Sequence, residues 1–311
     1  MDKSRTIWFY VPPRVHMLDL AGPIQVFYEA NTYGARYDLQ YFTTTEHPTS
    51  SAGLPFGQIR QFNLVVPSAG DYIFVPGAEM EFLYSNELRQ NVGFLSWLMT
   101  MPGRGVFVCS ICTGAFILAG SGLLNNKRCT THWKRIPELQ TTYPNVIVEE
   151  NILYTHDEQV YTSAGITSGI DLSLAIIEEH YGPMFTHKVA RELLVYHRRS
   201  SNHGQHSVYL DYRNHLNVGI HVVQDWLIEN LHQKTTIDKL AAMANMSSRN
   251  FTRLFRKSAG ITVNEYMRRL RVEKAQTLQN NPILSSEDIA SQIGYTNSRQ
   301  LRRIKKKGKP K

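Results

Sequence analysis

The chain has 311 residues, of which 42% are apolar and 19% are charged, and this length predicts about two domains. Its apolar runs are shorter than the roughly 18 to 20 residues that a membrane-spanning helix needs, and its N-terminus does not resemble a secretory signal. We therefore expect a soluble, cytoplasmic protein with no membrane partner. Three cysteines, Cys109, Cys112 and Cys129, are too few for a disulfide framework, so we expect free thiols.

The positive charge is concentrated in the C-terminal third. Residues 1–199 carry 15 Lys and Arg against 18 Asp and Glu, whereas residues 200–311 carry 19 against 8, so the formal net charge changes from −3 to +11. A basic segment attached to a mildly acidic body indicates a polyanionic partner, most simply nucleic acid. A solvated basic surface is the alternative that charge alone leaves open.

Short apolar segments alternate with helical patterns in the first half of the chain. Strands are predicted over 6–11, 37–43, 71–76 and 105–110, and helices over 22–31 and 86–100. A hairpin is predicted from 146–151 and 159–164, followed by a helix over 171–182. This order predicts an α/β domain with an open, mostly parallel, flavodoxin-like sheet.

Residues 199–217 are polar and lack a regular period, which predicts a linker between a domain at 1–198 and one at 218–311. The second domain is expected to be entirely helical. Three of its helices begin with the sequence form of a capping box, at Thr235 and Asp238, Thr262 and Glu265, and Ser285 and Asp288.

The second domain contains an internal repeat. Residues 239–255 and 288–305 each read as a helix, a short turn and a second helix, the pattern of a helix-turn-helix. In the first copy Phe251, Leu254 and Phe255 are expected to be buried. The side chains expected to face DNA are Arg249, Thr252, Arg253 and Arg256 in the first copy and Ser298, Arg299, Arg302 and Arg303 in the second. Arg pairs well with guanine, although a phosphate contact or an internal ion pair remains open for each arginine.

The segment LAAMANMSSRNFTRLFRKSAGITVNEYMRRLRVEKAQTLQ, followed by IASQIGYTNSRQLRR, resembles the AraC/XylS family of bacterial transcription regulators over about residues 218–304. The resemblance implies two recognition helices that enter successive major-groove segments of double-stranded DNA. The chain departs from the family at its end, where Lys305 occupies an aromatic position and a further helix is missing. The second unit is therefore expected to be atypical or truncated.

The segment GVFVCSICTGAFILAGSGLL leads from an apolar strand directly into a helix, with Cys112 at the turn and Gly114 after it. A thiol at a helix N-terminus is expected to favour its thiolate. Cys112 should therefore be alkylated before the other cysteines, with a pH profile that lies below that of a free thiol, whose pKa is about 8.5. His132 is a candidate base or orienting group. A redox or metal pair of Cys109 with Cys112 is less favoured, because Cys109 lies inside the strand and no second ligand pair accompanies it.

The segments MLDLAGPIQVF, FVPGA, ICTGAFILAGSGLL, TTHW and AGITSGIDL resemble the PfpI-like members of the class I glutamine amidotransferase-like superfamily, over about residues 5–195. The resemblance implies that His132 and the acidic Asp19 neighbour Cys112. It also implies an oxyanion-binding nest formed by backbone N–H groups of Gly77, Ala78 and Thr113. Asp19, Cys112 and Thr113 match catalytic positions of the related isonitrile hydratases. Ala78 departs from the glycine that many relatives have.

The two resemblances in this order describe the GlxA-like subgroup of AraC regulators. They imply a DNA-binding transcription regulator that senses a small, often nitrogen-containing metabolite. We expect a homodimer formed through residues 1–198, because one pair of recognition helices covers only one half of a repeated operator, with RNA polymerase as a further partner. No cofactor and no metal site are expected. A cysteine-dependent hydratase or hydrolase fused to a DNA-binding domain is the alternative, and a redox-sensing role for Cys112 is a third hypothesis.

Overall fold

A computed structural model describes residues 4–195, 208, 212–213, 215–279 and 284–300. The chain divides into two compact units, residues 1–205 and 206–311. Most of the segment expected to be a linker lies outside the described residues. Two of its described residues, Val208 and Tyr212, pack against the apolar core of the second unit.

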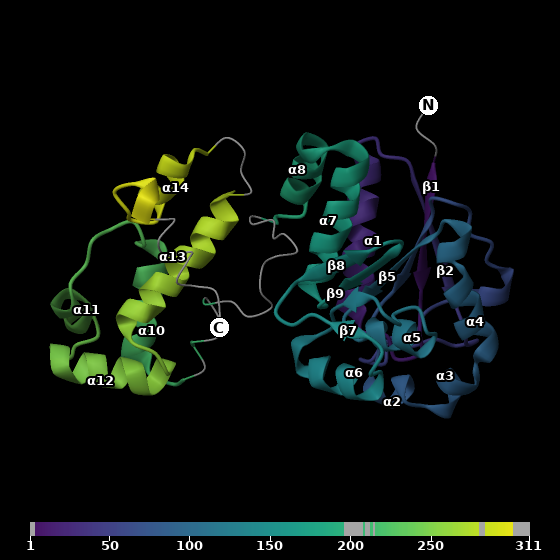
Figure 1. Cartoon of the computed structure of the whole chain (residues 1–311), viewed down its shortest axis with the longest axis horizontal. Helices are drawn as coiled ribbons and strands as arrows, with labels where there is room; N and C mark the ends of the chain where they lie inside the picture. The colour runs from purple at the N-terminus through teal and green to yellow at the C-terminus, as the bar shows by residue number, and fades with distance from the viewer. Residues whose placement is uncertain (1–3, 196–207, 209–211, 214, 280–283, 301–311) are drawn as a thin grey trace. The chain divides into compact units, whose positions relative to one another are not determined.

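The first unit is built on a seven-stranded sheet, and the expected open, mostly parallel α/β fold is confirmed (Figure 1). The strands in spatial order are β3 (Arg60–Gln61), β2 (Tyr37–Thr43), β1 (Arg5–Tyr10), β4 (Tyr72–Val75), β5 (Phe107–Ile111), β9 (Val160–Ser163) and β8 (Tyr154–Asp157). All neighbouring pairs are parallel except β8 and β9, which run antiparallel. Parallel strands meet their ligands at their carboxyl ends, and this edge is where the candidate site lies.

Helices cover both faces of the sheet. One face carries α1 (Met17–Thr32), α7 (Thr167–Tyr181) and α8 (Pro183–Glu192). The other carries the short helices α2 (Met80–Leu83), α3 (Asn86–Gln90), α4 (Val92–Thr100), α5 (Gly114–Gly120) and α6 (Ile136–Thr142). Because both faces are covered, the central strands are apolar on both sides, which explains the continuous apolar runs in the sequence.

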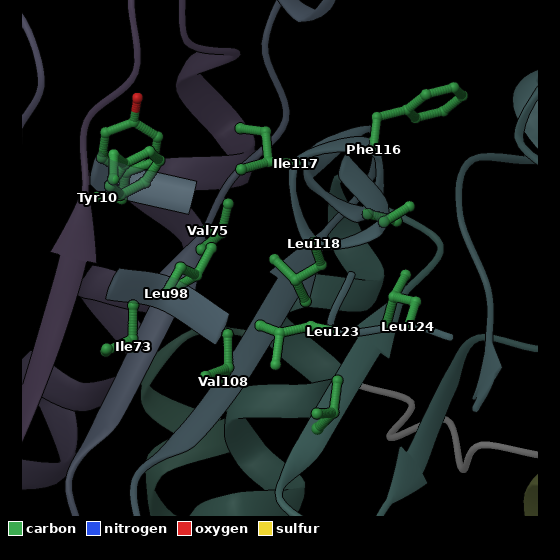
Figure 2. Close-up of a cluster of buried hydrophobic side chains, with 14 of the residues drawn as sticks. Tyr10, Ile73, Val75, Leu98, Val108, Phe116, Ile117, Leu118, Leu123 and Leu124 are labelled. Carbon is green, nitrogen blue, oxygen red and sulfur yellow. The ribbon is translucent and has the colours of Figure 1, made fainter. Parts of the chain in front are cut away.

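Figure 2 shows part of the core under α4 and α5. Ile73, Val75 and Val108 point from β4 and β5 toward Leu98 and the apolar residues of α5, and all are fully buried. The alternate residues of β4 and β5, among them Cys109, belong instead to the core under α1 and α7. This alternation along the strands fixes the side of the sheet that Cys109 faces.

The hairpin prediction for 146–151 and 159–164 was wrong. Residues Ile147–Val148 form β7, which pairs in parallel with β6 (Arg128–Cys129) in a separate two-stranded sheet. The hairpin partner of β9 is β8, a strand that the sequence pattern did not predict because YTHD has little apolar character. The helix expected over 86–100 is also two helices, α3 and α4, which meet at Asn91; its side chain caps the second by accepting from Phe94 N–H.

The second unit is helical in its described part, with α10 (Val218–Glu229), α11 (Ile237–Met243), α12 (Ser248–Ala259), α13 (Val263–Gln279) and α14 (Ser286–Gln292). Phe251 and Phe255 of α12 pack with Tyr266 of α13 in the centre, while Leu254 is partly buried against them. A smaller core lies between α13 and α14, built on Ala275, Ile289, Ala290 and Ile293. The expected all-helical class is confirmed.

Two adjacent threonines, Thr235 and Thr236, have different roles at the start of α11, and this difference can be tested by mutation. The expected cap at Thr235 was wrong: Thr236 is the N-cap of α11, and its hydroxyl accepts from Lys239 N–H, whereas the Thr235 hydroxyl is buried without a partner among the described residues. Replacing Thr236 with alanine should therefore lower the free energy of unfolding by about 1 kcal/mol. Thr235→Ala, the matched control, should change it much less in the same urea titration, and equal losses would contradict this assignment.

Candidate functional site

Cys112 lies in the sharp turn between β5 and α5. Its φ of +56° is a left-handed backbone conformation that is unusual for a residue with a side chain. The turn is pressed against β4, because a Cβ on Gly114 would lie 2.1 Å from the carbonyl oxygen of Val75. Only glycine fits at that position. The strand, turn and helix expected around this cysteine are thus present, and the strained residue in the turn is the cysteine itself.

The carboxylate of Asp19, in the first turn of α1, faces the thiol of Cys112. Asp19 is 1% exposed. Its Oδ1 accepts a hydrogen bond of 2.7 Å from the Ile166 N–H, whereas its Oδ2 is buried without a hydrogen-bond partner among the described residues. His16 Nδ1 lies 3.5 Å from Oδ2. The donor atoms of His16, Asp19 and Cys112 all lie within 4.8 Å of one another, so the start of α1 and the turn between β5 and α5 bring three reactive groups together.

Two glycines let the backbone approach these groups closely. A Cβ on Gly165, whose φ is +105°, would lie 2.6 Å from Cys112 Sγ. A Cβ on Gly77 would lie 2.5 Å from Asp19 Oδ2. Both positions require a residue without a side chain, and both therefore shape the site.

The expectation that Cys112 favours its thiolate was wrong. Burial raises the pKa of the Cys112 thiol well above its ordinary value, and the nearby Asp19 carboxylate raises it further. Hydrogen bonding from Thr113 acts in the opposite direction but is weaker. The sequence placed the thiol at a helix start, but it could not show that the thiol is 4% exposed beside a carboxylate.

All three cysteines are free and buried. Burial raises the pKa of Cys129 to about 12 and that of Cys109 well above its ordinary range. None of the three thiols is therefore expected to be strongly nucleophilic at neutral pH.

We expect iodoacetamide to modify Cys112 at pH 8 at least about tenfold more slowly in the folded chain than in urea, because the thiolate is the nucleophile and a raised pKa leaves less of it. The modification rate should increase only at a pH higher than the pH at which a free thiol begins to react. Mass spectrometry of the Cys112 peptide, in buffer containing EDTA, would measure both. Rapid modification with an apparent pKa below 8.5 would instead support the hypothesis that the Cys112 thiolate is activated.

His132 lies near this site, but its role beside the thiol stays a prediction. Its Nδ1 accepts the Lys134 N–H at 3.4 Å, and the hydrogen bonds of the described residues do not join it to Cys112. Burial lowers the pKa of His132, the charge of Lys134 lowers it further, and Asp19 opposes them, so the ring lies near the edge of the same site. The histidine beside the thiol is His16. Its only sequence signal was the His-x-x-Asp spacing at the start of a helix.

The expected nest of N–H groups is partly occupied. The Ala78 N–H donates to the Thr113 hydroxyl at 3.2 Å, and that hydroxyl also lies 3.0 Å from Ala78 O. Gly77 contributes its carbonyl, which accepts the His16 N–H at 2.8 Å. The Thr113 N–H is directed at the Cys112 thiol. An incoming oxyanion would have to displace the Thr113 hydroxyl from Ala78.

The second unit presents a basic helix face. Arg249, Thr252, Arg253 and Arg256 of α12 are all exposed, on the side opposite Phe251 and Phe255, as the sequence predicted. Arg253 is hydrogen-bonded to Asn250 Oδ1 at 2.9 Å, which holds its guanidinium along the helix. This arrangement has the apolar and basic stripes that a recognition helix needs.

The second repeat is described only in part. Ser298 begins a helical segment, where its N–H and hydroxyl both bond the Glu287 carboxylate, and Arg299 is exposed. Arg302 and Arg303, as well as the chain end expected to be atypical, lie outside the described residues. Within the described ranges, we find no helix that is both long and apolar enough to cross a membrane.

Family comparisons divide the chain in the same way. Residues 5–179 match the model of the DJ-1/PfpI family, and residues 240–308 match a helix-turn-helix domain model. The HTH-type transcriptional regulator GbdR from Pseudomonas aeruginosa is 26% identical over 68% of this chain and 56% of its own length. The chain thus spans little more than half of that regulator.

Two further relatives represent the two functional hypotheses. The HTH-type transcriptional regulator CdhR from Pseudomonas aeruginosa is 26% identical over 94% of this chain and 85% of its own length. An isonitrile hydratase from Pseudomonas putida is 31% identical, over 57% of this chain and 72% of its own length. The regulator aligns with nearly the whole chain, and the hydratase aligns with little more than half of it.

Proposed function

The chain belongs to the DJ-1/PfpI family and carries an AraC-type helix-turn-helix domain, and from this premise we propose that it is a sequence-specific DNA-binding transcription regulator. The observation that carries the proposal is α12, a helix held by Phe251 and Phe255 that exposes three arginines on its opposite face. Exposed arginines on such a helix fit guanine edges in the major groove.

In this proposal the first unit senses a small, nitrogen-containing metabolite at the site of Cys112 and Asp19. The buried Asp19 carboxylate offers an acceptor, Oδ2, that has no hydrogen-bond partner among the described residues, and an amine or ammonium group would supply a donor. The effector regulates transcription by linkage: a ligand that binds two arrangements of the protein unequally shifts their populations.

The active form in this proposal is a homodimer, which contacts RNA polymerase when it is bound at a promoter. One pair of recognition helices reads only one half of a repeated operator, and a two-fold symmetric protein reads both halves. Sedimentation of the full-length chain with and without operator DNA tests this part. A monomer under both conditions at micromolar concentration would contradict it.

The alternative is a hydratase that uses Cys112, Asp19 and Thr113, and the similarity to an isonitrile hydratase favours it. Two features oppose turnover by a thiolate. The pKa of Cys112 is raised by burial, and the Ala78 N–H is already bonded to Thr113. Consumption of an isonitrile by the wild-type chain, lost in Cys112→Ser, would support the alternative.

Selection from randomised duplex DNA, followed by titration of the selected sequence, tests the regulator directly. The logarithm of the binding constant should fall linearly with the logarithm of salt concentration, because phosphate contacts release counterions. The selected site should bind at least about a thousandfold more tightly than random duplex. If no sequence is enriched and low salt gives no retention, the regulator proposal fails.

A further inference from the structure

Three metal-ligating atoms of different chemical types converge beside the turn between β5 and α5, here called the elbow. They are a ring nitrogen of His16, a carboxylate oxygen of Asp19 and the sulfur of Cys112, all within 4.8 Å of one another. Ligands at about 2.0 to 2.3 Å from one tetrahedral Zn²⁺ are separated by roughly 3.3 to 3.7 Å. The 3.5 Å between His16 Nδ1 and Asp19 Oδ2 already has this value, and the sulfur needs to move by about 1 Å at most.

The free oxygen of Asp19 is an independent indication of a missing positive partner. Asp19 is almost fully buried, its Oδ1 is bonded to Ile166, and its Oδ2 has no hydrogen-bond partner among the described residues. His16 Nδ1, at 3.5 Å, and the Cys112 thiol face this carboxylate, but neither gives Oδ2 a close hydrogen bond, and a buried carboxylate oxygen without a close donor or cation is energetically costly. A divalent cation between Oδ2 and the sulfur would compensate this oxygen in place of the amine donor of an effector, and would replace the repulsion between carboxylate and thiolate by attraction to both.

The surrounding backbone fixes the orientation of each of these groups. The Ile166 N–H orients the Asp19 carboxylate, the His16 N–H donates to Gly77 O, and the Cys112 carbonyl accepts the Thr131 hydroxyl at 2.8 Å. Such outer contacts preorganise metal ligands. The imidazole side chain of His16 is 37% exposed, so the group of three residues reaches the surface on the His16 side.

From this donor set we propose that His16, Asp19 and Cys112 bind a divalent transition-metal ion of the Zn²⁺ type with three protein ligands and one open position. On binding, the Cys112 thiol releases its proton to solvent and the sulfur forms the bond to the metal, while His16 binds in its neutral form. Cys109 takes no part. The proposal concerns metal binding and does not depend on DNA binding by the second unit.

Titration of the reduced, metal-free full-length chain with Co²⁺ alone tests the proposal, because cobalt in a tetrahedral site with a thiolate ligand absorbs strongly. We expect one equivalent per chain, a sulfur-to-cobalt charge-transfer band, and displacement of cobalt by Zn²⁺. Cys112→Ser should abolish the band. His16→Gln and Asp19→Asn should each weaken Co²⁺ binding at least tenfold.

Cys129→Ser and His132→Gln are the matched controls, since they remove a buried thiol and a nearby imidazole that are outside the ligand set, and both should bind Co²⁺ like the wild type. Thermal unfolding of each metal-free variant checks that it folds; His16→Gln, at a half-exposed position, keeps the test valid if Asp19→Asn does not fold. Absence of the charge-transfer band in the wild type, or undiminished binding in Cys112→Ser and His16→Gln, would overturn the proposal. DNA binding measured on the same samples distinguishes this failure from failure of the regulator proposal.

Discussion

Replacing Arg249 with alanine should weaken binding to the selected DNA site by about 1 to 3 kcal/mol, or roughly 5- to 150-fold, with little change in binding to random duplex. Arg249 lies in the first turn of α12, where a recognition helix enters the major groove, and its side chain is exposed. A bidentate contact to guanine contributes only at the correct base. Fluorescence anisotropy with both duplexes at one salt concentration measures the difference.

Lys239→Ala provides the charge-matched control for this experiment. Lys239 belongs to α11, and its ammonium lies 4.7 Å from the ring centre of Trp226. The substitution therefore removes one positive charge from the same unit but from a different helix than α12. It should affect both duplexes alike and modestly, through the general electrostatic term. Equal losses on both duplexes in Arg249→Ala would mean that Arg249 contacts phosphate and does not read a base.

The sequence predicted the central sheet well because central parallel strands are buried on both faces. The apolar runs that became β1, β4 and β5 need no knowledge of their neighbours to be recognised. At the edge, strand formation depends on a partner that lies elsewhere in the fold. VIVEEN has strand character, but only two of its residues pair, whereas the more polar YTHD becomes β8 because β9 lies beside it.

The sequence identified two of the three clustered residues, Asp19 and Cys112, but not their electrostatics. Cys112 and Asp19 followed from motifs, and the exposed stripe of α12 followed from helical periodicity. His16 was not among the predicted residues, because its approach to the thiol depends on how the start of α1 packs against the turn around Cys112. The direction of the Cys112 pKa shift depends on the exposed fraction of the thiol and on its distance to a carboxylate. Neither quantity can be read from spacing along the chain.

Gly114→Ala should destabilise the first unit by about 4 kcal/mol or more, which is exceptional for the addition of one methyl group. The new Cβ would lie 2.1 Å from Val75 O and 3.0 Å from Pro76 O, and both obstacles are backbone atoms. Relief therefore requires that α5 move away from β4, and this would shift the neighbouring Cys112 and open the core that Figure 2 shows.

Gly120→Ala, at the other end of the same helix, is the matched control for Gly114→Ala. Its Cβ would meet only the Tyr143 hydroxyl at 3.3 Å, which is a side-chain atom that can move, and alanine favours the helix by up to about 1 kcal/mol. Calorimetry of the full-length Gly114→Ala chain should show a lower unfolding temperature for the first unit and an unchanged unfolding temperature for the helical unit. Because the elbow geometry requires the tight contact with β4, a Gly114→Ala variant as stable as Gly120→Ala would show that the turn around Cys112 is not held as described.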